Sequence, residues 1–254
     1  MRKIWSYYNL GKRIGNDVEY KKAKEETIKE ISKNGKRTDI INYFLKLTRS
    51  DNYLEIGINN PAKNFDKIQC INKTSVDPGY EYPANPADFK ITSDEFFKLL
   101  NNKEISELEN VLFDVIFIDG LHVAPQVEKD IFNALEYLKD DGFLILHDCN
   151  PPTEYHQREN NRYLNSPARD IWNGTTWKAF YKFRHVDKYF SICFDCDWGV
   201  AVISKKEIYG FNHIPHHLEN SFFEFTLFDK NRKQHINLFD FFEWRENFEL
   251  SNKQ

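Results

Sequence analysis

Glycine is scarce in this sequence, and the scarcity limits the kinds of nucleotide site that the chain can hold. Only 10 of the 254 residues are glycine. A dinucleotide site uses several glycines in one loop, in the pattern Gly-x-Gly-x-x-Gly, so that the backbone can approach a pyrophosphate. Any ligand loop that depends on glycine must therefore be short in this chain.

Cysteine is also rare and unevenly spaced. The four cysteines, at positions 70, 149, 193 and 196, are too few for a disulfide framework in a chain of this length. Cys193 and Cys196 have Cys-x-x-Cys spacing, but no second pair exists to complete a zinc site. We expect structural thiols and a reducing, cytoplasmic location.

Long apolar runs and a basic excess are both missing. Nowhere do 18 apolar residues follow one another, and the first residues include no apolar stretch of signal-peptide length, so we expect neither a membrane partner nor secretion by that route. Lys and Arg number 35 against 39 Asp and Glu, a net charge of −4, which disfavours general nucleic-acid binding. Hydrophobic residues make up 41% of the chain, enough for a large buried core without staples.

The order of apolar segments predicts an α/β fold. The first 50 residues have helical patterns, and residues 52 to 147 then alternate short apolar strands with amphipathic helices, which implies a doubly wound, Rossmann-like and mostly parallel sheet. The predicted strands cover residues 52–58, 74–79, 88–92, 113–118 and 143–146; the predicted helices cover residues 64–71, 93–100 (with Ser93 as N-cap) and 125–138, the last of them ended by Gly142.

The sequence after residue 150 predicts helices and an antiparallel hairpin added to that sheet. A polar connection at residues 151–174 precedes a helix at 176–182, an antiparallel hairpin at 189–193 and 198–204, and an amphipathic tail helix at 235–248. We expect one domain over residues 1–254. It would consist of N-terminal helices (1–50), a core (51–204) and a C-terminal helical extension (205–254).

Polar side chains follow each predicted strand, where an open α/β sheet binds its ligands. They are Glu55 and Asn59 at the end of the first strand, with Gly57 between them, Asp77 at the end of the second, Ser93 and Asp94 after the third, Asp119 and His122 after the fourth, and His147 and Asp148 after the fifth. Carboxylates gathered at one edge repel one another unless a cation or a hydroxyl-rich ligand binds there.

These motifs resemble the class I S-adenosylmethionine-dependent methyltransferases. The segments YLEIGINN, SVDPG, TSDEFF, FDVIFIDGLH and LHDCNP stand in the family order, and the resemblance covers roughly residues 36–204. More narrowly, the chain looks like a bacterial subgroup associated with surface-polysaccharide and capsule biosynthesis. The resemblance implies a transferase that uses S-adenosylmethionine, releases S-adenosylhomocysteine and methylates a small polar acceptor, such as a sugar hydroxyl or a capsule-precursor group.

The residue types suit that cofactor. Asp77 can accept both hydroxyls of a ribose, and Gly57 permits close approach of the backbone to the ligand. Glu55 would organise the loop or receive the ligand's ammonium, and Asn59 tolerates a left-handed conformation. Ser93 and Asp94 would flank the adenine.

On the acceptor side, Asp119 would lie near the methyl group, and His122 or His147 would act as the base, with His122 preferred. Some related O-methyltransferases hold magnesium with carboxylates at these strand ends, which makes Asp119 and Asp148 candidate metal ligands. However, Cys149 takes the next position and Asn150 comes one residue late, and cysteine is a poor magnesium ligand, so metal dependence is the less favoured alternative.

Two other functions stay open. A non-catalytic scaffold could keep the fold and bind a partner through its aromatic tail, which includes Phe239, Phe241, Phe242 and Trp244; a homodimer fits either function. An NAD-linked oxidoreductase would also use a carboxylate after the second strand, but Ile58 and Asn59 stand where its loop needs glycine.

Overall fold

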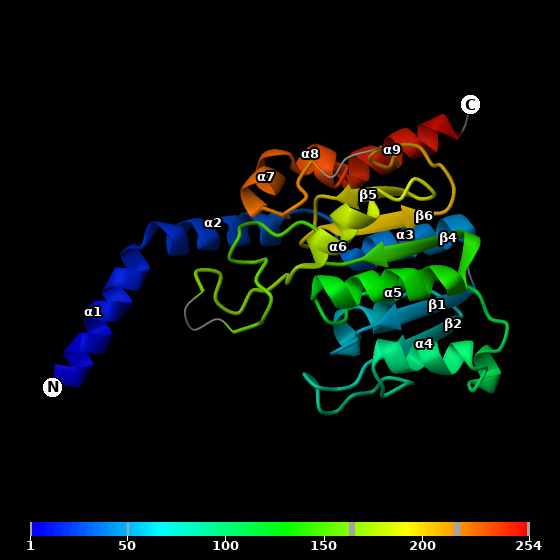
Figure 1. Cartoon of the computed structure of the whole chain (residues 1–254), viewed down its shortest axis with the longest axis horizontal. Coiled ribbons are helices and arrows are strands. Elements are labelled where there is room, and N and C mark those ends of the chain that lie inside the picture. Colours follow the sequence, from blue (N-terminus) through cyan, green and yellow to red (C-terminus); the bar gives the residue numbers. More distant parts are fainter. Residues whose placement is uncertain (1, 50, 163–165, 216–218, 253–254) are drawn as a thin grey trace.

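The computed structural model describes residues 2–49, 51–162, 166–215 and 219–252, which form one seven-stranded sheet with helices on both faces (Figure 1). The strands are β1 (Asn52–Ile56), β2 (Asn72–Val76), β3 (Phe113–Ile118), β4 (Leu138–Leu146), β5 (Phe190–Phe194), β6 (Val200–Ser204) and β7 (Leu238–Phe239). Their order is β2-β1-β3-β4-β6-β5-β7.

The sheet is mostly parallel, as the sequence predicts. Strands β2, β1, β3 and β4 pair in parallel, β6 pairs antiparallel with both β4 and β5, and β7 is parallel to β5. The chain leaves β1 toward β2 on one side and later returns to β3 on the other. The strand order therefore reverses between β1 and β3, and the carboxyl edge at this point is where an open α/β sheet binds its ligand.

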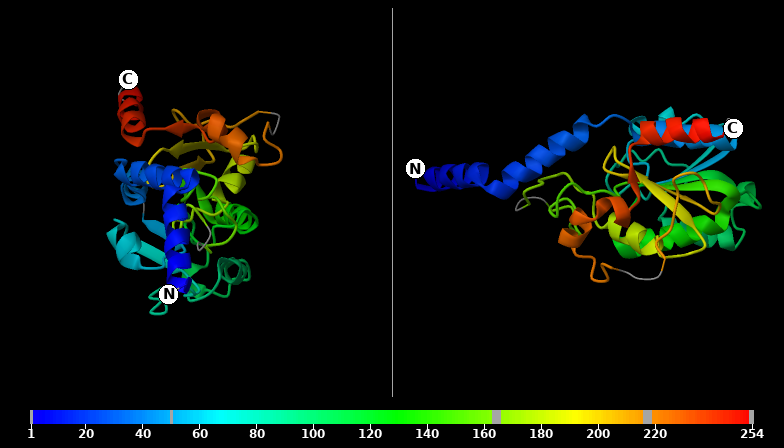
Figure 2. Two further views of the ribbon diagram at one scale, coloured as in Figure 1. Left: turned by 90° about the vertical axis from the view of Figure 1, so that its left-hand side faces the viewer. Right: turned by 90° about the horizontal axis from the view of Figure 1, so that it is seen from above.

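Two apolar cores lie on the two faces of the sheet. On one face, helices α4 (Ser93–Asn101), α5 (Ala124–Tyr137) and α6 (Thr176–Phe183) cover alternate residues of the central strands. On the other face, α3 (Arg37–Thr48) and α9 (Phe241–Ser251) pack against the remaining residues. The six residues of β3 are all buried because both faces of this strand are covered. Figures 1 and 2 show these layers.

Three predictions between β1 and α4 are wrong. Residues 64–71 form no α-helix: the chain makes two 3₁₀ turns, η1 (Pro61–Lys63) and η2 (Phe65–Lys67), because the Asn64 side chain turns inward to Glu55. Residues 88–92 contribute a single bridge, Phe89 to Val76, instead of a strand. The N-cap of α4 is Thr92, whose hydroxyl accepts from the Glu95 amide, and Ser93 is the first helical residue.

The boundaries differ at two further places. Helix α5 ends at Tyr137 and β4 begins at once, so Gly142 lies within the strand instead of ending the helix. The tail is not one helix over 235–248: α7 (Phe225–Lys230) and α8 (Arg232–His235) precede β7, and Asp240 then caps α9 with its carboxylate. Phe241 and Trp244 are buried in this chain's own core, which removes them from the predicted docking surface.

The N-terminal helices extend away from the sheet. Helix α1 (Arg2–Asn16) and helix α2 (Val18–Ser32) follow one another, with the Asp17 carboxylate capping α2. Figure 2 shows α1 and the first part of α2 projecting from the body as an arm. None of the helices in the described part of the chain is long and apolar enough to cross a membrane.

Candidate functional site

The turn after β1 depends on a glycine that approaches the end of β3. Gly57 has a φ of +88°, and a Cβ at this position would lie 2.3 Å from the backbone oxygen of Asp119. Both the conformation and the space therefore exclude a side chain. Asn59 follows with a φ of 44°, which asparagine tolerates better than most residues.

Asp77 organises the turn at the end of β2. Its Oδ2 accepts from the Asn59 amide at 2.9 Å, and its Oδ1 accepts from the Gly79 amide at 2.6 Å. Each carboxylate oxygen can accept more than one hydrogen bond, so these two contacts orient the carboxylate and leave acceptor capacity at the carboxyl edge.

Glu55 points into the protein and is satisfied there. Its Oε2 accepts from the Tyr53 hydroxyl at 2.6 Å and from the Asn64 amide at 3.0 Å. Burial raises the pKa of Glu55 to about 7, although these two hydrogen bonds lower it. Of the two roles that the sequence suggests, this geometry favours organisation of the loop after β1.

Ser93 and Asp94 begin α4 and lie beside α5. Gln126 donates to the Asp94 carboxylate at 2.8 Å and lies 3.4 Å from the Ser93 hydroxyl, while Lys129 pairs with Asp94 at 3.3 Å. The hydrogen bond from Gln126 is the largest cause of the lowered pKa of Asp94. Asp94 is therefore an anchored, partly exposed acceptor.

The ends of β3 and β4 bring four predicted residues together. His122 Nε2 lies 3.2 Å from Asp119 Oδ1, and His122 Nδ1 lies 2.9 Å from Asp148 Oδ2. His147 Nδ1 lies 3.1 Å from Asp119 Oδ1 and 3.3 Å from Asp148 Oδ2. The two histidines and the two carboxylates thus form one cluster, which we call the His–Asp cluster.

Sequence analysis misses two residues of the same site, Arg37 and Asp197. Arg37 pairs with Asp119 through Nη1, donates through Nε to Asp197 at 3.0 Å, and lies 3.3 Å from His147 Nδ1. Helix α3 leads into the amino end of β1, so its first residue stands at the carboxyl edge. The hairpin before the antiparallel β6 turns at that edge too, which brings in Asp197.

The charges in the cluster support one another. Burial alone would lower the pKa of both histidines, but the carboxylates outweigh it, raising the pKa of His122 well above its usual range and that of His147 to about 9. Burial likewise opposes ionisation of Asp119 and Asp148, yet the facing cations hold the pKa of both carboxyls well below the usual range. Both histidines are thus cationic near neutral pH.

A loop closes over the cluster. The Trp172 ring stacks on His122, with ring centroids 5.1 Å apart, and its indole N–H donates to the Arg158 backbone oxygen. Asn173 donates to Asp148 Oδ1 at 2.6 Å, whereas Asn173 Oδ1 is buried without a partner among the described residues. Trp177, by contrast, is fully buried against Phe228.

The donor set does not fit magnesium. Asp119, His122 and Asp148 have ligand atoms within 4.8 Å of one another, but magnesium prefers oxygen ligands and His122 offers nitrogen. Both Asp119 oxygens already face Arg37 or a histidine, and both Asp148 oxygens face Asn173 or a histidine. Asn150 is directed to Asp195 and Arg232, and Cys149 is buried.

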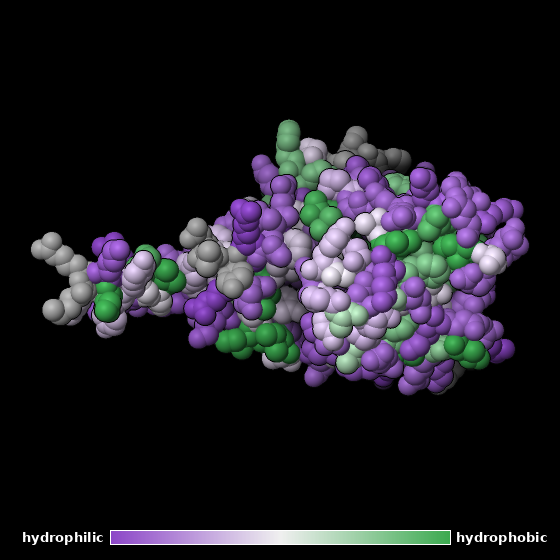
Figure 3. All heavy atoms as spheres, turned by 90° about the horizontal axis from the view of Figure 1, so that it is seen from below, coloured by the Kyte–Doolittle hydropathy of each residue, from purple (hydrophilic) through white to green (hydrophobic). Residues whose placement is uncertain are grey.

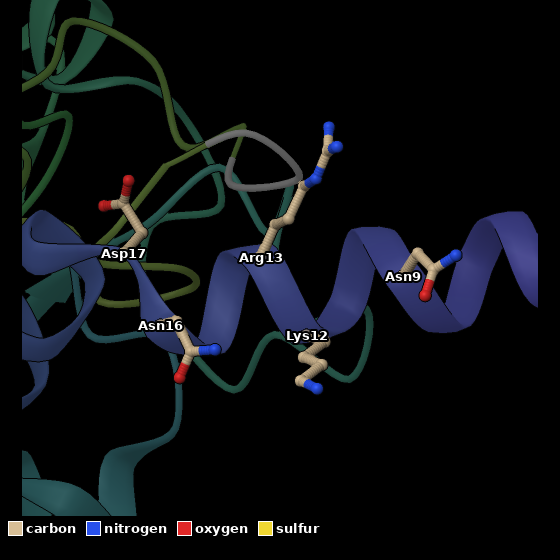
Figure 4. A pocket seen from close by; sticks show the side chains of 5 residues that line it. All are labelled: Asn9, Lys12, Arg13, Asn16 and Asp17. Carbon is tan, nitrogen blue, oxygen red and sulfur yellow. The ribbon is translucent and has the colours of Figure 1, made fainter.

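The thiols and a surface hollow lie outside this chemistry. All four cysteines are free, and Cys149, Cys193 and Cys196 are buried, in agreement with structural thiols. A hollow at the junction of α1 and α2 is lined by five residues, Asn9, Lys12, Arg13, Asn16 and Asp17 (Figure 4). None of these side chains belongs to the His–Asp cluster.

Comparison with known proteins gives one family match. Residues 62–149, about a third of the chain, match the model of a methyltransferase domain family. This segment runs from the turn after β1 to the end of β4, and so includes Asp77 and the whole His–Asp cluster. No curated protein matches the sequence.

Several solved structures are similar at a low level. An O-methyltransferase from Bacillus cereus, solved with S-adenosylhomocysteine, is 10% identical over 74% of this chain and 91% of its own, with a TM-score of 0.45. An S-adenosylhomocysteine-bound methyltransferase from Podospora anserina is 13% identical over 82% and 97% respectively, with a TM-score of 0.46. Likenesses this weak support no conclusion about ligand or substrate.

Proposed function

We propose that this chain is an S-adenosylmethionine-dependent methyltransferase. The observation that carries the proposal is the position of Gly57 and Asp77 at the carboxyl edge beside the strand reversal, within a chain whose residues 62–149 match a methyltransferase domain. When bound, the cofactor supplies an electrophilic methyl group on a positively charged sulfur.

The residues on the β1 and β2 side would hold the cofactor. Asp77 is oriented by two backbone amides and would accept the ribose hydroxyls, and Gly57 would let the ligand approach the backbone. Asn59, Ser93 and Asp94 would line the nucleoside portion, while Glu55 holds the loop in place from within the protein. Asn173 Oδ1, which is buried and has no partner among the residues that the structure describes, adds an acceptor that a bound molecule would satisfy.

The His–Asp cluster would bind the acceptor and take its proton. Methyl transfer is an in-line displacement, so the protein must align the acceptor oxygen and accept the proton that the hydroxyl loses. His122 is our preferred base: its two ring nitrogens face Asp119 and Asp148 at the loop that closes the site, and one of them would turn to the acceptor hydroxyl when the acceptor binds. Deprotonated His122 would accept the proton, and the two carboxylates would stabilise the imidazolium that forms.

The acceptor we propose is a sugar hydroxyl or a related capsule-precursor group. Trp172 stacks on His122 and presents an aromatic surface beside the cluster, against which the C–H face of a sugar ring can pack. The carboxylates and Asn173 provide acceptors for its hydroxyls. Because the donor set Asp119, His122 and Asp148 does not fit magnesium, we assign proton transfer to this chain's own residues.

Calorimetry on the purified full chain tests the cofactor assignment. We expect micromolar dissociation constants for S-adenosylmethionine and S-adenosylhomocysteine. NAD should bind at least about tenfold more weakly, because the Gly57 turn lacks the further glycines that a pyrophosphate needs. If neither sulfur-containing ligand binds, the proposal is wrong. If both bind but a panel of nucleotide sugars and free sugars yields no methylated product by mass spectrometry, the acceptor assignment is wrong and the scaffold alternative gains support.

A further inference from the structure

Helix α1 has a composition unlike the rest of the chain. It contains four basic residues, Arg2, Lys3, Lys12 and Arg13, and no acidic residue, although the whole chain has a net charge of −4. Five of its apolar and aromatic side chains are between 53% and 72% exposed: Ile4, Trp5, Tyr7, Tyr8 and Leu10. The helix is thus cationic and apolar at once, and its large side chains face solvent.

These side chains are sorted onto two faces of the helix. At helical spacing, Ile4, Tyr7, Tyr8, Leu10 and Ile14 fall on one face. At the same spacing, Asn9, Arg13 and Asn16 fall on the opposite face. Lys12 stands at one boundary beside Trp5, and Lys3 lies between Leu10 and Ile14 within the apolar sector. The stems of both lysines can lie along an apolar phase while their ammonium groups stay in water.

No described part of the body covers the apolar face. Helix α1 projects from the molecule in Figure 1 and in the right-hand view of Figure 2, and hydrophobic side chains lie open along the arm in the space-filling view (Figure 3). An exposed apolar face of this extent on a helix is a site of association.

We propose that α1 binds the surface of an anionic lipid bilayer and lies in its plane. A cationic amphipathic helix with Trp and Tyr among its apolar residues is the sequence type that partitions into the headgroup region. Its 15 residues span about 22 Å, less than the roughly 30 Å hydrocarbon core, so the helix lies on the bilayer and does not cross it. This inference departs from the sequence-based expectation of no membrane partner.

A second copy of the chain suits α1 less well than an anionic surface. Pairing α1 with another α1 would bring eight basic side chains together without one acidic side chain to offset them. The apolar spacing also extends over only two heptads, which is short for a coiled coil. An anionic bilayer offers an apolar phase for Ile4 and Tyr8 and phosphate groups for Lys12 and Arg13.

The arm connects to the loop that closes the candidate site. The Thr27 hydroxyl of α2 lies 3.0 Å from His156 Nε2, and His156 belongs to the segment that leads to Trp172. Figure 1 shows the arm and this loop at the same end of the molecule as the carboxyl edge of the sheet. Binding through α1 would therefore turn the site toward the bilayer.

Vesicle sedimentation of the full chain tests the proposal. We expect the wild type to sediment with vesicles of phosphatidylcholine containing one-third phosphatidylglycerol, to stay in solution with pure phosphatidylcholine, and to be released by high salt. Lys12→Glu/Arg13→Glu and Ile4→Ser/Tyr8→Ser should each weaken partitioning about tenfold.

Matched variants on the body separate this effect from a general one. Lys90→Glu/Lys98→Glu changes the same charge at exposed positions, and Ile71→Ser/Phe222→Ser removes exposed apolar side chains elsewhere; both should partition as the wild type does. Failure of the wild type to bind anionic vesicles, or equal losses in the control variants, overturns the proposal. A light-scattering mass of two chains that Ile4→Ser/Tyr8→Ser reduces to one would assign the face to a second copy instead.

Discussion

The guanidinium of Arg37 pairs with the carboxylate of Asp119 although 82 residues separate them in the sequence. The same Arg37 side chain also donates to Asp197, so one cation joins the start of α3, the end of β3 and the hairpin before β6. Because burial leaves these carboxylates little solvent, the facing cations His147 and Arg37 together hold the pKa of both carboxyls low and keep them ionised.

Arg37→Gln should lower the free energy of unfolding by about 3 kcal/mol, since it removes one of the buried cations that face Asp119 and Asp197. Urea denaturation at neutral pH measures the loss. The double variant Arg37→Gln/Asp119→Asn should recover part of it, because it also removes the negative charge of one of the two carboxylates that lose Arg37 as a partner. Equal stability of wild type and Arg37→Gln would show that the pair contributes nothing to folding.

Stability should fall in alkaline solution as His147 loses its proton. The pKa of this residue is raised from 6.5 to about 9 in the folded chain, so its contribution is complete below pH 6.5 and disappears as pH rises through 9. The loss should be on the order of 2 to 3 kcal/mol. Denaturation between pH 6 and 10 measures it, and His147→Gln should show a flatter curve over the same interval. A wild-type curve as flat as that of the variant would contradict the raised pKa.

Local patterns predicted the parts of the fold that local forces decide. The apolar run Phe113–Ile118 is buried on both faces and forms the expected strand. The predicted helix at residues 64–71 is wrong because the Asn64 side chain donates to Glu55, a contact that spacing along the chain does not reveal. The prediction that Gly142 ends the helix is wrong because α5 passes directly into β4 after Tyr137, and the pairing of β4 with β3 decides where the helix ends.

The site follows the same division. Gly57, Asp77, Asp119 and His147 end successive strands, so the topology alone predicts that they share an edge. Arg37 begins a helix within the charged and polar run Lys36–Asp39, which is typical of a solvated first turn and does not signal a role. Only the packing of α3 against β3 and β4 reveals that the Arg37 side chain reaches the carboxyl edge of the sheet. The direction of a helix that precedes the first strand is a signal that could have found it.

Asp77→Asn should weaken S-adenosylmethionine binding about tenfold to a hundredfold. A neutral amide keeps the shape of the side chain but loses the charge of an acceptor that is worth about 1.5 to 3 kcal/mol for each hydrogen bond. Calorimetry measures the dissociation constant. Asp66→Asn, at an exposed position of η2, is the matched control and should bind as the wild type does. Unchanged binding by Asp77→Asn would place the ribose elsewhere.

Exhaustive chelation should leave methyl transfer unchanged, and added magnesium should not raise it. The carboxylate oxygens of Asp119 and Asp148 already face Arg37, Asn173 and the two histidines, so they offer magnesium no free pair of ligands. Turnover with and without chelator, together with the metal content of the purified protein by mass spectrometry, decides the matter. Loss of turnover that magnesium restores would show that the cluster rearranges around the ion.

His122→Gln should lower turnover by about a hundredfold if His122 is the general base. The facing carboxylates raise its pKa well above 6.5, so the deprotonated form that accepts a proton gains population as pH rises, and wild-type turnover should increase above neutral pH. The variant should lose this rise while its affinity for S-adenosylmethionine, measured by calorimetry, stays within about twofold, because the side chain would contact the acceptor. His147→Gln is the comparison at the neighbouring histidine. Near-wild-type turnover of His122→Gln, with a large loss in His147→Gln, would move the proton-accepting role to His147.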